Sequence, residues 1–158
     1  MRGRHRLKHP KKTYAKDTAL HEAAHVVAAI LQGYPVERVT IIPDSESLGK
    51  TLFMEGFALC LTDEEQAIAF LAAFAIEARI NPKDKALEAT AQDWIEVKRL
   101  AEGKADEWID EQSENAVKIV HENFALIQRL ADELTRKGCL SGDEIHALID
   151  EFLTHEAT

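Results

Sequence analysis

Two histidines with a glutamate between them give this sequence its clearest chemical signal. The segment 18–33, TALHEAAHVVAAILQG, contains His21, Glu22 and His25 in the pattern His-Glu-x-x-His. On a helix of 3.6 residues per turn, the two imidazoles project from one face, one turn apart. Imidazoles at that spacing can bind one zinc ion through Zn–N bonds of about 2 Å. The motif therefore predicts two ligands of a zinc site.

Glu22 lies beside the two histidines on this helix rather than in line with them. It is rotated by about 100° from His21 and by about 60° from His25. From there its carboxylate can reach a metal-activated water without taking a coordination position. Such a carboxylate accepts the proton of the water and passes it to a leaving amine. Glu22 is therefore expected to be the general base of a zinc metallopeptidase.

The apolar residues around the motif allow a second interpretation. Two histidines on a buried helix face can be core residues whose polar atoms are satisfied by hydrogen bonds. Burying them with Glu22 and without partners would cost several kcal/mol, and metal ligation removes that cost. The metal site is the interpretation that we carry forward.

A catalytic zinc site needs a third protein ligand and one open position. The other histidines are poorly placed, since they lie in the N-terminal segment, on the C-terminal helices or near the end of the chain (His5, His9, His121, His146, His155). A carboxylate is expected instead. Asp93, in the segment EATAQDWIEVKRLA, is the best placed on a separate helix. Glu88 and Glu77 are alternatives that spacing alone does not rank.

The elements that position these residues are mostly helices. Gly33 follows the motif helix, capping boxes at residues 62–65 and 141–144 open two further helices, and Asn81-Pro82 ends one. A stretch rich in β-branched residues, VERVTIIP, indicates a strand. The expected fold class is mainly α with a small β-sheet. We expect helices over residues 17–32, 67–80, 86–100, 105–137 and 144–153, and strands within residues 36–43 and 51–60.

The longest of these helices, residues 105–137, has a clear apolar face. Gly103 precedes it and Gly138 ends it. Apolar residues recur along it at helical spacing, as expected of a helix that packs on a core. The residues that mark this face are Trp108, Val117, Val120, Phe124, Ile127, Leu130 and Leu134.

Charge is unevenly distributed along the 158 residues, whose net charge is −9. Residues 1–16 contain seven Lys or Arg and no acidic residue, so the other 142 residues have 12 basic and 28 acidic residues, a net charge of −16. We divide the chain into a basic flexible arm, residues 1–16, and a single domain, residues 17–158. The arm could bind RNA or acidic lipid, although only Tyr14 interleaves its charges, so nucleic acid is not the expected partner.

The remaining composition favours a cytoplasmic protein. Cys60 and Cys139 are the two cysteines and do not form a C-x-x-C motif, which argues against a disulfide scaffold. No apolar run reaches the ~18–20 residues that a membrane span requires. The basic N-terminal segment is not followed by an apolar stretch, so no secretory signal is expected.

Several segments resemble, in order, the zinc-peptidase domain of the FtsH-type AAA proteases. TALHEAAHVVAAIL resembles the family helix TA-x-HEAGHA-V-A, and VERVTIIPDSESLGKTLF is similar to V-x-K-V-T-I-x-P-R-G-x-x-L-G-x-T. LAAFAIEARI and QDWIEVKRLA take the places of the family's G-G-R-x-A-E and N-D-L-x-x-A-T helices. NFALIQRLADELTRKGCLSGDEIHALI follows the family's closing helices. The similarity covers the chain from about residue 18 onward.

The resemblance implies a fold and a set of roles. His21, His25 and Asp93 would be the zinc ligands, Glu22 the base, and Glu77 an acidic residue that orients a ligand imidazole from outside the metal site. Glu77 could equally satisfy a buried polar contact. The implied fold is a helical peptidase domain with a small sheet. Its edge strand, expected within residues 48–54, would pair with an extended polypeptide substrate.

The chain also departs from the family pattern. Ala24 replaces a glycine of the motif helix, Ala73 and Phe74 replace the paired glycines, and Val97-Lys98 replaces A-T. No G-x-x-x-x-G-K-[ST] motif occurs, so the chain has no ATP-binding loop with which to unfold a substrate. The expected substrates are therefore short or unfolded polypeptides, with a separate ATPase as a possible partner. The family's hexamers make a homo-oligomer possible. The main alternative is a catalytically silent relative that binds a peptide or a protein partner.

Overall fold

The computed structural model describes residues 15–53 and 61–156, which form seven helices and one three-stranded antiparallel sheet. The chain is thus mainly α with a small sheet, as the sequence predicts. Residues 1–14 of the basic arm lie outside the described residues, as do residues 54–60, where most of the second expected strand and Cys60 fall. Within the described part, no helix has both the length and the apolar character that crossing a membrane requires.

The seven helices and three strands of the described residues follow one another along the chain in the order given next. They are α1 (Lys16–Leu31), β1 (Val36–Thr40), β2 (Lys50–Phe53), α2 (Asp63–Ile80), α3 (Lys83–Ala89), α4 (Ala91–Leu100), α5 (Trp108–Glu122), α6 (Phe124–Lys137), β3 (Cys139–Ser141) and α7 (Gly142–Glu156).

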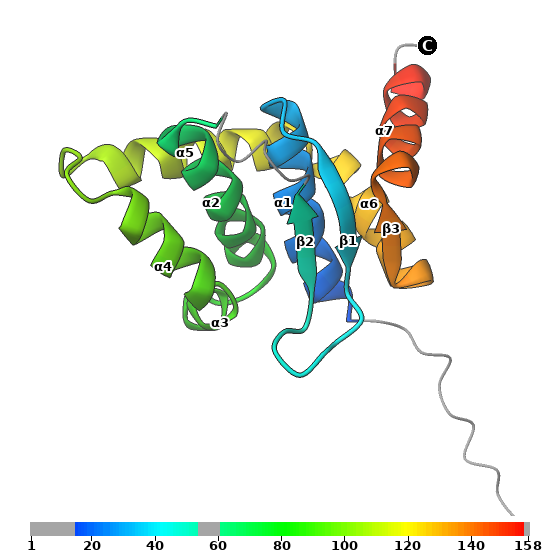
Figure 1. Cartoon of the computed structure of the whole chain (residues 1–158), viewed down its shortest axis with the longest axis horizontal. Helices are drawn as coiled ribbons and strands as arrows, with labels where there is room; N and C mark the ends of the chain where they lie inside the picture. The colour runs from blue at the N-terminus through cyan, green and yellow to red at the C-terminus, as the bar shows by residue number, and fades with distance from the viewer. Residues whose placement is uncertain (1–14, 54–60, 157–158) are drawn as a thin grey trace, which may run out of the picture.

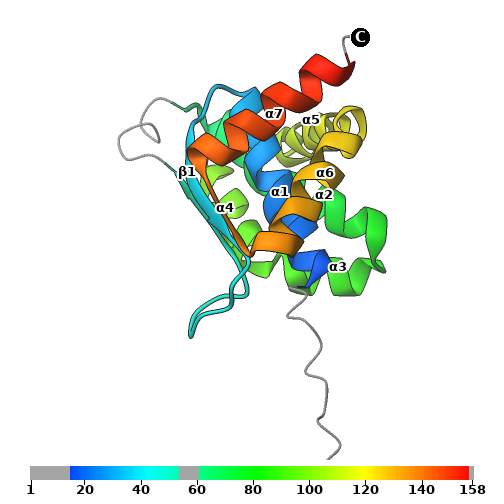
Figure 2. The ribbon, with the colours of Figure 1, turned by 90° about the vertical axis from the view of Figure 1, so that its right-hand side faces the viewer.

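Helix α1 lies at the centre of the fold. It packs against α2 on one side, α6 on another, and β1 and β2 on a third. Figure 1 shows the sheet in front of α1, and the quarter turn of Figure 2 shows the sheet covering one side of that helix. Ten residues of α1 are buried, five of them alanine, and such small side chains let the neighbouring elements approach closely. Helix α1, which carries the motif, is therefore covered by α2, by α6 and by the sheet.

The sheet has the strand order β2-β1-β3, with both pairs antiparallel. Val39 is the central residue, paired with Thr51 on one side and Leu140 on the other. Strand β1 ends at Thr40, earlier than the predicted residue 43. The Thr40 hydroxyl accepts a hydrogen bond from the Ile42 amide at 3.2 Å, so a side chain replaces a neighbouring strand as the partner of that amide. Strand β2 is at one end of the sheet, and no strand of the described residues pairs with its outer edge.

Both capping boxes form as predicted. At the start of α2, Thr62 Oγ1 accepts a hydrogen bond from the Glu65 amide at 3.1 Å, and Glu65 Oε1 accepts one from the Thr62 amide at 3.2 Å. Ser141 and Glu144 exchange the same two hydrogen bonds at the start of α7. Strand β3 lies between Gly138 and Gly142 and was not predicted, because three residues are too few to show an alternating pattern.

Two predicted helices are each divided in the structure. The segment 86–100 consists of α3 and α4, which meet at Thr90, and the segment 105–137 consists of α5 and α6, which meet at Asn123. At both residues ψ is near +18°, outside the helical range. The Thr90 hydroxyl donates to the Ala86 carbonyl at 2.7 Å, and the Asn123 amide donates to the Ile119 carbonyl at 2.9 Å. The backbone amides of Thr90 and Asn123 donate to the same two carbonyls, at 3.2 and 3.0 Å, so each side chain adds a second donor at the last turn of the first helix.

The division at Asn123 also corrects the predicted apolar face. The buried residues of α5 are Trp108, Gln112, Ala116 and Val120, a stripe at four-residue spacing. Val117, which was expected on this face, lies one position off the stripe and is 55% exposed. The predicted α6 residues Ile127, Leu130 and Leu134 are fully buried and pack on α1.

Candidate metal centre

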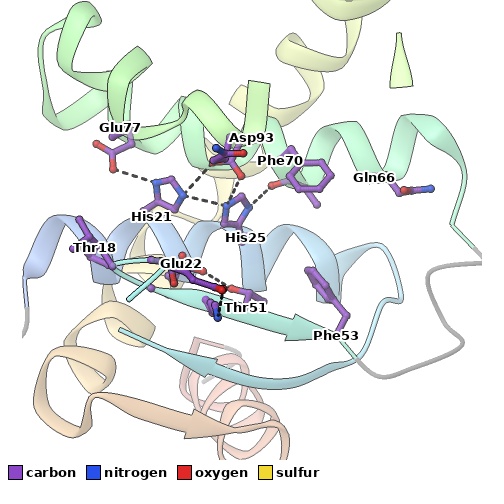
Figure 3. Close-up of a pocket in the computed structure, with 18 of the residues that line it drawn as sticks. Thr18, His21, Glu22, His25, Thr51, Phe53, Gln66, Phe70, Glu77 and Asp93 are labelled. Atoms are coloured by element: carbon purple, nitrogen blue, oxygen red, sulfur yellow. Dashed lines mark hydrogen bonds and ion pairs between the residues drawn. The ribbon is translucent and has the colours of Figure 1, made fainter. Parts of the chain in front are cut away.

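The structure brings His21, His25 and Asp93 together from two helices. His21 and His25 project from α1, and Asp93 lies in the first turn of α4. His21 Nε2 is 3.2 Å from Asp93 Oδ2, His25 Nε2 is 3.3 Å from Asp93 Oδ1, and the two Nε2 atoms are 3.2 Å apart. Figure 3 shows the three side chains converging on one point. Of the three carboxylates weighed from the sequence, Asp93 is the one that reaches both imidazoles.

The two imidazoles are spaced like neighbouring ligands of a tetrahedral metal ion. With metal–ligand bonds of about 2.0–2.1 Å and tetrahedral angles, neighbouring donor atoms lie about 3.3 Å apart. The two Nε2 atoms are 3.2 Å apart, and each contacts a different oxygen of Asp93, at 3.2 and 3.3 Å. Taking one donor atom from each residue, the group lies within 4.8 Å. Two imidazoles and a carboxylate are also the donor types that bind Zn²⁺.

In the neutral imidazoles, the hydrogen bonds made by Nδ1 place the hydrogen there and leave Nε2 without one. His25 Nδ1 lies 2.8 Å from the Ala69 carbonyl oxygen, which can only accept, so Nδ1 carries the hydrogen. His21 Nδ1 lies 3.2 Å from Glu77 Oε1, and an ionised carboxylate requires a hydrogen there too. In the neutral imidazoles, both Nε2 lone pairs then face each other and a carboxylate. Such a cluster of acceptors needs an added positive charge, either protons or a metal ion.

The shifted pKa values of His21, His25 and Asp93 also indicate that this cluster favours an added positive charge. Burial alone would lower the pKa of His21, but the hydrogen bonds to Asp93 and Glu77 outweigh it and raise that pKa to about 10. Burial opposes the charged form of His25 as well, and its hydrogen bond to Asp93 still raises the pKa. Burial acts to raise the pKa of Asp93, yet its hydrogen bonds to both imidazoles hold that pKa below the usual range. The metal-free site therefore attracts cations.

Glu77 supports the site from outside the donor group. It lies on α2 and is 3% exposed. Its Oε2 accepts a hydrogen bond at 3.0 Å from the side-chain amide of Asn81. The same Asn81 amide reaches Asp17 Oδ2 at 3.3 Å. Because Glu77 contacts Nδ1 of His21 rather than Nε2, it fixes the ring without facing the metal position. From the sequence, orienting a ligand and satisfying a buried contact were equal possibilities; the structure shows the buried contact, to both His21 and Asn81.

Glu22 lies next to the donor group, between α1 and β2. It is buried, with 6% of the residue exposed. Its Oε2 accepts a hydrogen bond from the hydroxyl of Thr51 on β2 at 2.6 Å. Figure 3 shows Glu22 and Thr51 on the strand side of α1, while the imidazoles point toward α4. This placement agrees with the rotation expected around the helix.

A cavity of about 590 Å³ connects these groups. His21, Glu22, His25, Glu77 and Asp93 all line it. Residues of β2 and the preceding loop form one wall, and apolar side chains occupy the end beyond His25, as Figure 3 shows for Phe53 and Phe70. The remaining wall residues include Tyr34, Leu48, Gly49, Lys50, Thr51, Leu61, Gln66 and Gln92.

The other candidates from the sequence lie elsewhere. Glu88 is exposed on α3, His121 on α5 and His146 on α7. His155 is exposed at the end of α7, and His5 and His9 fall outside the described residues.

Three supporting residues could not be found from the sequence. Thr51 and Asn81 lie 29 and 4 positions from the carboxylates that they contact, and neither belongs to the motif. Ala69 contributes only its backbone carbonyl, which every residue type has, so the sequence does not indicate this contact. The L-G-x-T similarity that includes Thr51 was the one available signal, and it did not indicate which residue the hydroxyl contacts.

Comparisons with known proteins assign no family to the chain. Neither the scan of protein-family models nor the search of curated proteins found a match. The function therefore has to be argued from the chemistry of the site.

Proposed function

We propose that this protein is a zinc metallopeptidase that hydrolyses peptide bonds in unfolded or short polypeptides. The observation that carries the proposal is the group formed by His21, His25 and Asp93, with one donor atom from each within 4.8 Å of the others and Glu22 in the same cavity. Three protein ligands leave the fourth position of a tetrahedral zinc site open, as catalytic zinc sites do. A closed structural site would have a fourth protein ligand instead.

The roles of the residues follow from their positions. When bound, zinc would lower the pKa of a water and polarise the scissile carbonyl. Glu22 accepts the proton of the attacking water and delivers it to the leaving amine. Glu77 and the Ala69 carbonyl hold the imidazoles with Nε2 turned inward.

The open edge of β2 supports a polypeptide as the substrate. Lys50, Thr51 and Phe53 of β2 line the cavity, and β1 occupies only the other edge of this strand. An extended chain can add to such an edge through backbone hydrogen bonds, which give affinity with little dependence on sequence. A folded protein has few free extended segments, so unfolded and short polypeptides are favoured.

The same proposal places the chain among FtsH-type peptidase domains. The support is the ordered set of similar segments, together with a motif helix, an aspartate on a separate helix and a β-strand beside them. It would act on loosely folded chains, either alone or together with an ATPase. The catalytically silent alternative would keep the cavity and the β2 edge for binding.

Metal content and the variant Glu22→Gln test the proposal. Protein purified without chelators should contain one zinc per chain and cleave an unfolded, fluorescence-quenched polypeptide. Glu22→Gln should retain zinc and lose about 10²–10⁴-fold in turnover, the usual contribution of general acid–base catalysis. Glu88→Gln, the same change at an exposed position on α3, should match the wild type.

Three results would contradict the proposal in different ways. A protein that takes up no zinc, even when the metal is supplied, has no such centre. Hydrolysis retained by Glu22→Gln would refute the role of Glu22. Bound zinc and peptide without any hydrolysis would favour the silent, peptide-binding alternative.

A further inference from the structure

We propose that Thr51 of β2 is the positioning residue of the general base: its hydroxyl holds the carboxylate of Glu22. The absence of a side chain at Gly49 leaves room for that carboxylate. This inference rests on the proposed peptidase function. It adds a residue outside the His-Glu-x-x-His motif, on the strand expected to bind the substrate.

The hydrogen bond between Thr51 and Glu22 is the first observation. Thr51 Oγ1 lies 2.6 Å from Glu22 Oε2, a short distance typical of a hydroxyl that donates to an ionised carboxylate. Glu22 is buried, and this is the one side-chain hydrogen bond to its carboxylate among the described residues. One hydroxyl on a neighbouring strand therefore sets the direction of the carboxylate.

Gly49 supplies an independent second observation. A Cβ atom built at Gly49 would lie 3.1 Å from Glu22 Cγ, 3.2 Å from Glu22 Oε1 and 3.0 Å from Thr18 Cγ2. Contacts this short are tighter than those that side chains normally make. The backbone of the segment before β2 thus approaches Glu22 as closely as a residue without a side chain allows. Gly49 thus packs against Cγ and Oε1 of Glu22, while Thr51 binds Oε2.

The strand geometry connects this contact with substrate binding. Thr51 pairs with Val39 of β1 through the backbone, and its side chain points into the cavity with that of Phe53. Leu52, the residue between them, is 36% exposed on the opposite face. The outer edge of the same strand is where a polypeptide would pair. A chain bound there is therefore fixed relative to Glu22 through a single short strand.

A positioning role predicts a loss of kcat rather than of binding. Thr51→Val keeps the size and β-branching of the side chain but removes the donor. We expect kcat to fall about 10–100-fold, because a displacement of a catalytic group by about 1 Å can cost 10²-fold. KM should stay within about twofold, since the backbone groups of β2 that bind the substrate are retained.

Thr51→Ser and Thr40→Val provide matched controls. Thr51→Ser restores the hydroxyl and should recover at least about half of the wild-type kcat. Thr40 is a half-buried threonine on the adjacent strand, and its hydroxyl donates to the Gly138 carbonyl, away from Glu22. Thr40→Val should therefore leave kcat unchanged. Equal kcat for Thr51→Val and wild type, or failure of Thr51→Ser to restore activity, would overturn the proposal.

A double-mutant cycle in the metal-free protein tests the contact without using activity. The denaturation midpoints of wild type, Thr51→Val, Glu22→Ala and the double variant should be non-additive, because the hydroxyl has no carboxylate to hold once Glu22 is removed. Additive effects would overturn the proposal. If zinc-loaded wild type hydrolyses no polypeptide, the peptidase function fails, while the cycle still decides whether Thr51 holds Glu22.

Discussion

Glu77 and His21 are joined at the outer nitrogen of the imidazole, where Glu77 Oε1 lies 3.2 Å from His21 Nδ1. This contact places the hydrogen of the neutral ring on Nδ1 and turns the Nε2 lone pair toward Asp93. The direction of that lone pair decides whether α1 can supply a metal ligand at this position. A carboxylate on α2 thus determines what a histidine on α1 can bind.

Replacing Glu77 should weaken zinc binding without abolishing it. Glu77→Gln keeps an oxygen that can accept from Nδ1 but removes the negative charge behind the ring. Changes of this kind reduce metal affinity by about 10–100-fold. Competition with a chromophoric chelator measures the affinity, and Glu88→Gln serves as the exposed control. Wild-type affinity in Glu77→Gln would show that the carboxylate is only a buried hydrogen-bond partner.

Replacing Asp93 should remove the metal. Asp93→Asn is nearly isosteric but has lost the charge that neutralises the ion, and its amide nitrogen cannot coordinate. We expect less than a tenth of the wild-type zinc per chain after dialysis, read by elemental analysis. Far-UV circular dichroism would establish that the variant is folded. A folded Asp93→Asn protein with full zinc content would exclude Asp93 as the third ligand.

Zinc binding should weaken as the pH falls. The metal-free His21 has a pKa raised to about 10, so at neutral pH it holds a proton that zinc must displace. Each proton released makes the apparent affinity fall about tenfold for each unit by which the pH is lowered. Titrations between pH 6 and 8 at constant ionic strength measure this slope. An affinity independent of pH over that range would contradict ligation by His21.

The metal-free protein should lose stability as the pH rises toward 10. A histidine whose pKa is higher in the folded than in the unfolded chain stabilises the fold fully below the unfolded value of about 6.5. That contribution disappears as the pH passes through the folded value of about 10. Denaturation midpoints in the presence of a chelator should therefore fall between pH 7 and 10. Adding zinc should reduce this dependence, because bound metal replaces the proton.

A side chain at Gly49 should lower turnover while zinc remains bound. Gly49→Ala introduces a Cβ about 3 Å from atoms of Thr18 and Glu22, so the carboxylate of the base has to move. We expect kcat to fall by about tenfold or more, as for other small displacements of catalytic groups. Ser45→Ala, an exposed position in the same loop, is the control. Unchanged kcat in Gly49→Ala would show that Glu22 tolerates the displacement.

The motif helix and the starts of two other helices could be predicted from the sequence, because they depend on residues that are close together along the chain. The motif helix was predicted as residues 17–32 and runs over Lys16–Leu31, and both capping boxes form between residues three positions apart. The divisions at Thr90 and Asn123 were missed. Both residues occur within ordinary helical composition, and the change of ψ that ends each helix there is not encoded by residue type.

The sequence alone determined the chemistry that this protein can offer: two imidazoles one turn apart with a carboxylate beside them, because helical periodicity depends only on neighbouring residues. The tertiary structure decided which groups meet them. Spacing alone did not rank Asp93, Glu77 and Glu88, but the packing of α2 on α1 and of α4 on α2 sets Asp93 against Nε2 and Glu77 against Nδ1, and leaves Glu88 in solvent. Contacts across 56 or more residues depend on how buried apolar faces pack, which local spacing does not encode.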